Sequence, residues 1–191
     1  MPLSQLLNEI EGCTLCAGQL PHEPRPVVRA AESARIMIIG QAPGRRVHET
    51  GIPWNDPSGK RLREWLQVDD ETFYDPEKIA IMPMGFCFPG TGKSGDLPPR
   101  PECAPAWHQR LWNELPNIQL TLLIGQYAQN QYLPNKPKTL TETVQRWQDW
   151  APEYFALPHP SPRNQIWLKK NAWFGESVIP ALRQRVHDLL T

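Results

Sequence analysis

The sequence predicts an α/β protein, a three-layer α/β/α sandwich built on a central, mainly parallel, four-stranded sheet. Short apolar runs of strand length alternate along the chain with amphipathic segments of helical period, a pattern typical of parallel sheets with helices on both faces. The chain of 191 residues is long enough for one hydrophobic core, and it contains no internal repeat. We therefore expect a single domain over residues 1–191.

The first third of the chain is expected to supply two helices and one strand. Residues 3–11 (LSQLLNEIE) resemble a short helix, and residues 35–44 (RIMIIGQAPG) begin as a buried strand and break into a glycine-containing loop. Residues 58–66 (SGKRLREWL) place their apolar side chains on one helical face, with Ser58 as the expected N-cap.

The middle third is expected to contain two further strands. These are the apolar runs 78–84 (KIAIMPM) and 119–125 (QLTLLIG). A helix over 104–115 (APAWHQRLWNEL) lies between them, and residues 126–133 (QYAQNQYL) form the helix that follows the second run. This alternation indicates parallel strands joined by helical crossovers.

The last third is expected to add a helix over 140–150 (LTETVQRWQDW) and a fourth strand over 153–160 (EYFALPHP). A helical stretch then runs through 169–190 to the end of the chain. We expect this stretch to be interrupted before Pro180, because proline cannot donate the backbone hydrogen bond of a helix interior.

Three loops leave the carboxyl ends of the predicted strands: 40–59, 85–103 and 159–164. In open α/β sheets, ligands bind in the crevice outside these strand ends. The functional residues are therefore expected in these loops.

Charge and composition restrict the classes of partner. Lys plus Arg and Asp plus Glu number 20 each, so the formal net charge is zero and any nucleic-acid surface must be local. The N-terminus lacks the pattern of a signal peptide, and no apolar run approaches the ~18 residues of a membrane span. We expect a cytoplasmic protein with no membrane segment, in a compartment where thiols stay reduced.

The four cysteines form two pairs. Cys13-x2-Cys16 lies near the N-terminus, and Cys87-x15-Cys103 encloses the loop 88–102 (FPGTGKSGDLPPRPE). Together they could form a four-thiolate site for Zn²⁺ or an iron–sulfur cluster. Two disulfides or four unrelated core thiols are the alternatives, and a reducing compartment makes the disulfides less favourable.

Three motifs at the expected strand ends occur in a recognisable order. They are 40-GQAPGRRVHETGIPWNDPSG-59, 122-LLIGQYAQ-129 and 158-PHPSPRN-164. With the cysteine pattern, they resemble the uracil-DNA glycosylase superfamily over about residues 10 to 185, and most closely its iron–sulfur branch. The resemblance implies a monomeric DNA repair glycosylase, acting on DNA with a damaged base and holding a [4Fe-4S] cluster, with Zn²⁺ as the alternative.

The resemblance also implies roles in a base pocket. The implied pocket residues are Gly40, Gln41, Ala42, Pro43, Gly44, Trp54 and Pro83. Trp54 would stack on the flipped base, and His159 would stabilise negative charge that develops on the base. The alternatives are an ordinary tight turn for the glycines, a core position for Trp54 and a solvent-facing turn for His159.

The same resemblance implies contacts with the DNA backbone. Ser161 and Pro162 would contact phosphates, and Arg163 would add a phosphate contact or a wedge. Lys93 and Arg100 of the cysteine loop are further candidates for phosphate contact. A group of basic residues favours DNA over a free nucleoside as the substrate: Arg45, Arg46, Lys60, Arg61 and Arg63. Charged helix surfaces are, however, usually only solvated.

The pocket departs from the family pattern at the positions that carry its chemistry. Gln41 and Ala42 stand where related branches have Glu or Asp, so the usual water-activating carboxylate is absent. Pro83 stands where an Asn usually reads the uracil edge, and it offers only a carbonyl. His48, followed by Glu49, replaces an acidic residue. The preferred base could therefore be a deaminated or alkylated base other than uracil.

Other residues of the first loop could replace the missing base. We expect Asp56 or Glu49 to align the attacking water, His159 to stabilise the leaving base and His48 to be an additional pocket residue. The segment 45-RRVH-48 has a local likeness to an R-R-I-H-like loop that bonds covalently to an abasic sugar in one relative, so covalent trapping is a weaker alternative.

Two other functions remain open at this point. One is a catalytically silent DNA- or nucleotide-binding protein of the same fold, which the missing carboxylate and Asn favour. The other is a hydrolase or transferase that acts on free nucleosides in the same pocket. Fold-level analogy fits all three functions, so the site must distinguish them.

Overall fold

The computed structural model describes all residues from 1 to 191 and has the predicted central sheet. Its strands are β1 (Ile36–Ile39), β2 (Ile79–Ile81), β5 (Leu120–Ile124) and β6 (Tyr154–Leu157). All three strand pairs are parallel, in the spatial order β2-β1-β5-β6. Every residue of β1, β2 and β5 is buried, which explains why these strands read as continuous apolar runs.

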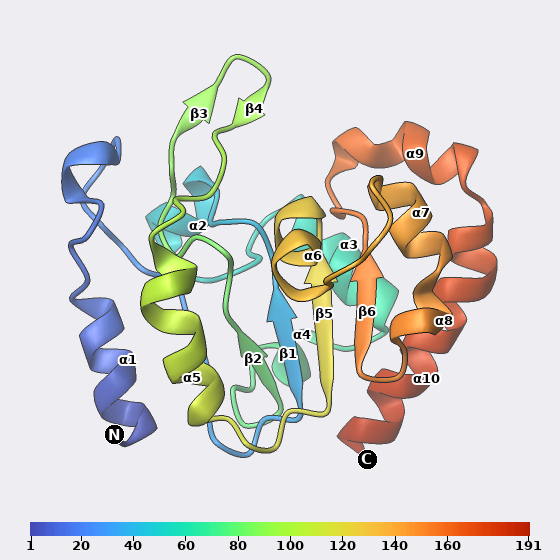
Figure 1. Cartoon of the computed structure of the whole chain (residues 1–191), viewed down its shortest axis with the longest axis horizontal. Helices are drawn as coiled ribbons and strands as arrows, with labels where there is room; N and C mark the ends of the chain where they lie inside the picture. Colours follow the sequence, from blue (N-terminus) through green and yellow to red (C-terminus); the bar gives the residue numbers. More distant parts are fainter.

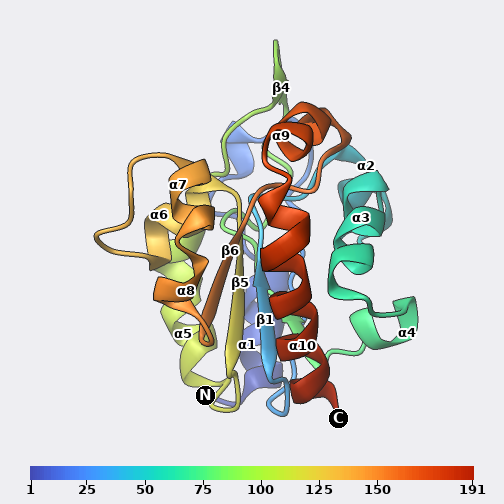
Figure 2. The same ribbon diagram turned by 90° about the vertical axis from the view of Figure 1, so that its right-hand side faces the viewer.

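Helices cover both faces of this sheet (Figure 1), and the edge-on view of Figure 2 shows the three layers. α6, α7 and α8 lie on one face, α3 and α10 on the other, and α1 and α5 stand beside β2. The predicted α/β/α sandwich is therefore confirmed. The helices are α1 (Leu3–Glu11), α2 (Arg45–Thr50), α3 (Pro57–Leu66), α4 (Asp70–Phe73), α5 (Gln109–Asn113), α6 (Gln126–Tyr132), α7 (Leu140–Gln145), α8 (Trp147–Trp150), α9 (Gln165–Lys170) and α10 (Ile179–Leu190).

Of two local expectations about the helices, one is wrong and one is confirmed. The N-cap of α3 is Asp56 rather than Ser58, because the Asp56 carboxylate accepts the Gly59 N–H and Pro57 occupies the first helical turn. The helical stretch over 169–190 is interrupted before Pro180, as expected, but the break lies at Asn171 and Ala172, where a turn follows the end of α9. A π-helical turn over Phe174–Val178 then leads directly into α10, which has Pro180 as its second residue.

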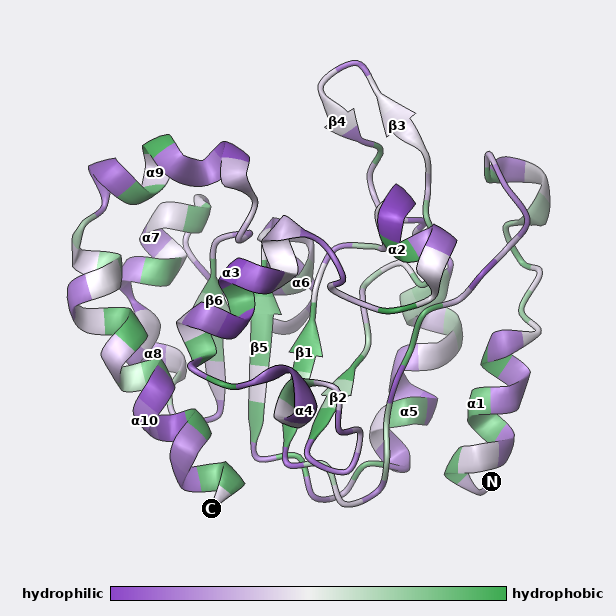
Figure 3. Ribbon diagram, turned by 180° about the vertical axis from the view of Figure 1, so that it is seen from behind, coloured by the Kyte–Doolittle hydropathy of each residue, from purple (hydrophilic) through white to green (hydrophobic).

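Three elements of the loops were not expected. The first-motif loop contains α2, α4 follows α3, and a hairpin of β3 (Thr91–Gly92) and β4 (Gly95–Asp96) rises from the cysteine loop. Figure 1 shows this hairpin projecting beyond the carboxyl ends of the strands. α2 and the hairpin therefore lie at the edge of the sheet where ligands are expected, whereas α4 lies towards the opposite edge (Figure 3).

One continuous core of 35 buried residues surrounds the sheet. Figure 3 shows the strands as predominantly hydrophobic, whereas the β3–β4 hairpin is mostly neutral to hydrophilic. The outer edge of β2 is partly covered, because Arg29 forms an antiparallel bridge with Ile81. None of the helices is both long and apolar enough to cross a membrane.

Candidate active site

A cavity opens at the carboxyl ends of β1 and β2. All seven expected pocket residues line it, and so do Asp56 and His159. Sequence reasoning missed its apolar wall, which comes partly from the segment before β1 and partly from α2 and β2. The complete lining is Val27, Gly40, Gln41, Ala42, Pro43, Gly44, Val47, Pro53, Trp54, Asp56, Ile81, Pro83 and His159.

Trp54 forms one wall of the cavity. Its backbone has a φ of 59°, and its carbonyl accepts a hydrogen bond of 3.1 Å from Arg63. The indole lies so close to Gly40 that a Cβ there would be 2.8 Å from Trp54 Cζ2. The Trp54 and His159 ring centroids are 5.8 Å apart. Trp54 is half-buried against the core and still borders the cavity, so it combines the core position with the expected pocket position.

The imidazole of His159 is held in one tautomer. Its Nδ1 accepts the Ser161 backbone N–H at 3.1 Å, and the proton of the neutral ring is therefore on Nε2. Burial lowers the pKa of His159, although the charge of Asp56 raises it. Asn164 donates to the His159 carbonyl at 2.7 Å and so closes the loop on itself. The site thus has a neutral imidazole whose free nitrogen is a hydrogen-bond donor.

Asp56 has a structural task that its sequence position did not reveal. Its Oδ1 accepts the Gly59 N–H at 2.8 Å and caps α3. The same residue lines both the cavity and a neighbouring groove. One carboxylate oxygen is therefore committed to the helix, at the border of the site.

The structure does not bring His48 or Glu49 to the cavity. α2 turns Val47 inward, and successive helical residues point in different directions. The His48 ring stacks on His22 at a centroid distance of 5.2 Å. Burial, followed by the charges of His22 and Arg25, lowers its pKa. Glu49 is exposed to solvent.

The backbone carbonyl of Pro83 takes part in a buried hydrogen-bond network. His108 Nε2 lies 3.0 Å from the Pro83 oxygen, and its Nδ1 lies 2.6 Å from the Tyr132 hydroxyl. Trp112 donates to the same hydroxyl at 3.0 Å. Because Nε2 must donate to the carbonyl, the Tyr132 hydroxyl donates to Nδ1. This buried network supports the cavity wall, and sequence reasoning missed it, because His108 lies in a helical segment with no motif.

A second hollow, an open groove, adjoins the cavity and shares Asp56 and His159 with it. The β3–β4 hairpin and the 159–164 loop border this groove, and Ser161 and Arg163 line it as expected for contacts with DNA. Arg163 Nη1 donates to the Ser94 carbonyl at 2.9 Å, which ties the loop to the hairpin. Pro162 begins a short 3-10 turn beside them.

The four cysteines line one pocket, although they come from distant parts of the chain. All are free thiols, and the Phe86 N–H points to Cys103 Sγ at 3.4 Å. Burial raises the pKa of Cys87 to about 12 and that of Cys16 to about 11. No three His, Cys, Asp or Glu side chains are arranged to hold a single metal ion. The two pairs therefore lie around one pocket, as expected.

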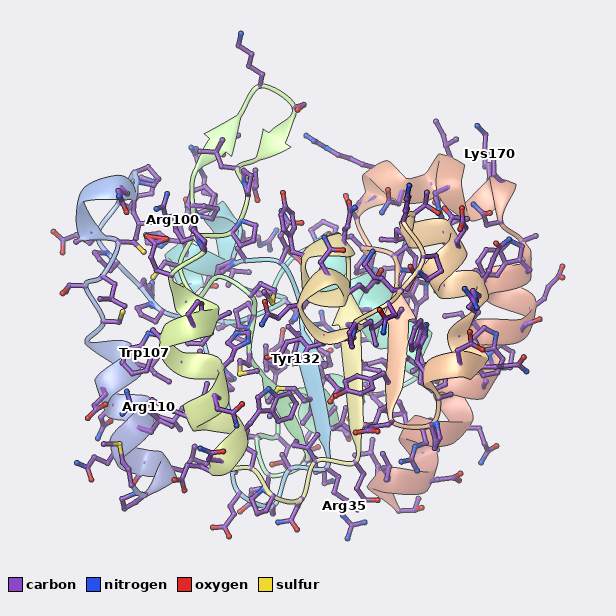
Figure 4. All side chains as sticks on the ribbon, viewed as in Figure 1. Arg35, Arg100, Trp107, Arg110, Tyr132 and Lys170 are labelled. Atoms are coloured by element: carbon purple, nitrogen blue, oxygen red, sulfur yellow. The ribbon has the colours of Figure 1, made fainter.

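Two basic residues of the cysteine loop have different surroundings. Arg100 forms an ion pair of 2.8 Å with Glu102 and donates to Gln19 at 3.0 Å. Figure 4 shows Arg100 between the N-terminal segment and α5, and Trp107 between α1 and α5. Arg100 thus lies beside the cysteines rather than in the groove, whereas Lys93 is exposed between β3 and β4.

Comparison with known families agrees with the expected resemblance. The family model described as the Uracil DNA glycosylase superfamily matches residues 28–183. The matched range contains all four strands of the sheet, the hairpin and every cavity residue except Val27. Cys13 and Cys16 lie outside it, so the match does not bear on the cysteine site.

Proposed function

Because the chain belongs to the uracil DNA glycosylase superfamily, we propose that it hydrolyses the N-glycosidic bond of a damaged base flipped out of DNA. Membership supports a glycosylase-like function and DNA as the substrate; the activity of this chain is our proposal. The observation that carries it is the cavity at the strand ends, where His159 keeps its proton on the free Nε2.

The residues of the cavity fit the needs of this reaction. A flipped base loses its stacking partners, and the Trp54 indole can replace one of them. As the C1′–N bond breaks, negative charge develops on the base, and a fixed donor such as His159 Nε2–H stabilises it most when it needs no reorganisation. Asp56 borders the site and can orient water with the carboxylate oxygen that does not cap α3.

The wall at Pro83 bears on the choice of base. This position has no N–H, and His108 already donates to its carbonyl. The cavity therefore lacks a side-chain amide at the place where the family reads the uracil edge. Recognition would rest on shape and backbone groups, which favours a range of deaminated bases over strict selection of uracil.

Release of free base from a panel of oligonucleotides tests this proposal. Single- and double-stranded DNA containing uracil, hypoxanthine or xanthine would be incubated with the protein under single-turnover conditions. We expect release of at least one base and an alkali-sensitive abasic site in the product. Tight binding to these strands without base release would instead support the catalytically silent alternative, which the absence of a carboxylate at Gln41 and Ala42 favours.

We also propose that Cys13, Cys16, Cys87 and Cys103 hold a [4Fe-4S] cluster. Support comes from the four free thiols that line one pocket, since thiolates are the ligands of iron–sulfur clusters as well as of Zn²⁺. The cluster would join the N-terminal helix to the hairpin loop and contribute folding energy. We propose further that the protein is a monomer in the reducing cytoplasm.

Protein purified without oxygen is expected to contain iron and acid-labile sulfide in equal amounts and to absorb visible light. Removal of the metal by a chelator should lower the melting temperature, because thiolate ligation contributes to folding. Protein from a Cys103→Ser variant should lose the colour and part of the stability. Stoichiometric zinc in a colourless wild-type protein would contradict the cluster and support the Zn²⁺ alternative.

A further inference from the structure

Asp96 is a carboxylate that the sequence motifs did not mark. It lies on β4, in the loop between the third and fourth cysteines. The structure places its Oδ2 against the first-motif loop, only 3.4 Å from the position that a Cβ on Gly44 would occupy. The hairpin thus carries a carboxylate across the groove to the loop that forms the cavity wall, and the absence of a side chain at Gly44 leaves room for it.

The groups that face Asp96 come from several elements. Asp56, His159 and Arg163 line the same groove, and Thr91 is the cross-strand partner of Asp96. Partial burial has the largest effect on the pKa of Asp96 and raises it, and the charge of Asp56 raises it further. Arg163, Thr91 and Arg45 act in the opposite direction and lower this pKa. The residue remains open to solvent in the free protein. Water can therefore reach a carboxylate that holds a proton more readily than an ordinary Asp.

We propose that Asp96 is the general base of this site, accepting the proton of the water that attacks the sugar. The proposal rests on the glycosylase function proposed above. In this step the water oxygen bonds to C1′, the C1′–N bond breaks, and its electron pair leaves with the base. The water proton passes to the Asp96 carboxylate and then to solvent, while the departing base is stabilised by His159 Nε2–H and takes its proton from solvent.

Asp96 suits this task better than the other residues near the cavity. Gln41 and Ala42 cannot accept a proton at neutral pH, and Glu49 lines neither the cavity nor the groove that contains Asp96. Asp56 has one oxygen bound to the Gly59 N–H, so its position is fixed by the start of α3. A separate hydrogen bond positions Asp96: Arg163 donates to the carbonyl of Ser94, which lies two residues before Asp96 on the hairpin. Asp56 then orients the water, and Asp96 accepts its proton.

The first test is single-turnover base release by an Asp96→Asn variant. We expect a loss of about 100-fold or more in the rate, the size typical of a missing general base, and partial recovery in Asp96→Glu. Asp149→Asn is the matched control, because Asp149 is an exposed carboxylate paired with Arg146 on α8. An Asp96→Asn variant that releases base at the wild-type rate would overturn the assignment and leave the glycosylase function intact.

The pH profile separates a base from a residue that only supports the hairpin. Because the pKa of Asp96 is raised, the wild-type rate should fall on the acid side at a higher pH than an ordinary Asp would give, and this limb should vanish in Asp96→Asn. Charged Asp96 lowers stability as pH rises through its raised pKa, so the variant should melt at the wild-type temperature or above it at neutral pH. An unchanged acid limb in the variant would contradict the proposal.

A binding measurement tests Asp96 even if no base is released. DNA with a cationic pyrrolidine azasugar mimics the charge of the reacting sugar, and DNA with neutral tetrahydrofuran is its control. Wild-type protein should prefer the cationic strand, and Asp96→Asn should lose that preference while it binds the neutral strand equally well. If no base is released by the wild-type protein, the proposed function fails. If, in addition, the wild-type protein and Asp96→Asn prefer the cationic strand to the same extent, the placement of Asp96 at the sugar is also overturned.

Discussion

Replacement of His159 by alanine is expected to slow base release by about 10²–10³-fold, the cost of one donor at a developing oxyanion. The Ser161 N–H holds His159 Nδ1, so the removed group is a preoriented Nε2–H in a mostly buried position. Single-turnover rates at saturating protein would report this loss without a contribution from weaker binding.

The pH dependence provides a second check on His159. Burial lowers its pKa, so the ring is neutral at pH 7 and stays neutral until the pH falls below that lowered value. The neutral donor is therefore present throughout the neutral range. His187→Ala is a suitable control, because His187 lies in the exposed last turn of α10 and contacts Gln67. Equal rates for His159→Ala and His187→Ala would contradict the proposed donor.

Gly59→Ala is expected to cause the largest loss of stability. A Cβ at this position would lie 1.7 Å from the Trp54 carbonyl oxygen and 2.5 Å from its carbonyl carbon. Both are backbone atoms, so a side-chain rotation cannot relieve the clash. Overpacking usually costs about 1–3 kcal/mol and more when the backbone must move; we expect the upper end or beyond for Gly59→Ala.

Denaturant unfolding would measure this loss, with Gly175→Ala as the control. Nothing lies within 4 Å of a Cβ at Gly175, which is in the π-helical turn before α10. Alanine there should leave stability unchanged or raise it by about 0.5–1 kcal/mol, since glycine is unfavourable in a helical segment. A Gly59→Ala variant as stable as wild-type protein would mean that α3 does not need its observed contact with Trp54.

The sequence predicted the elements of the core more accurately than those of the loops. β1, β2 and β5 are buried on both faces, and continuous apolar runs are the direct result of that burial. α2 was missed, because it has only six residues and one buried side chain, Val47. Gly51, with a φ of 73°, was an available signal for its end. The N-cap of α3 was misplaced by two residues, since Asp56 and Ser58 are both good caps.

The candidate site was predicted where its residues belong to one motif. Gly40 to Gly44 and Trp54 line the cavity, and all of them come from a single loop, so residues close in sequence are also close in space. His48 and Glu49 belong to the same loop, yet α2 turns them away from the cavity. Proximity in sequence was therefore not sufficient, because the direction of a helical side chain changes with every residue.

The sequence by itself determined the α/β/α architecture, the loops that carry most of the cavity residues and the two pairs of cysteines. Local periodicity reports burial and therefore indicates the architecture, whereas the motifs at the strand ends marked the loops. Only the tertiary structure decided that His108 binds the Pro83 carbonyl, that Arg163 latches the hairpin and that Asp96 reaches Gly44. These contacts join segments of the chain that are far apart in sequence. The packing of whole elements brings them together, and no local pattern of residues records it.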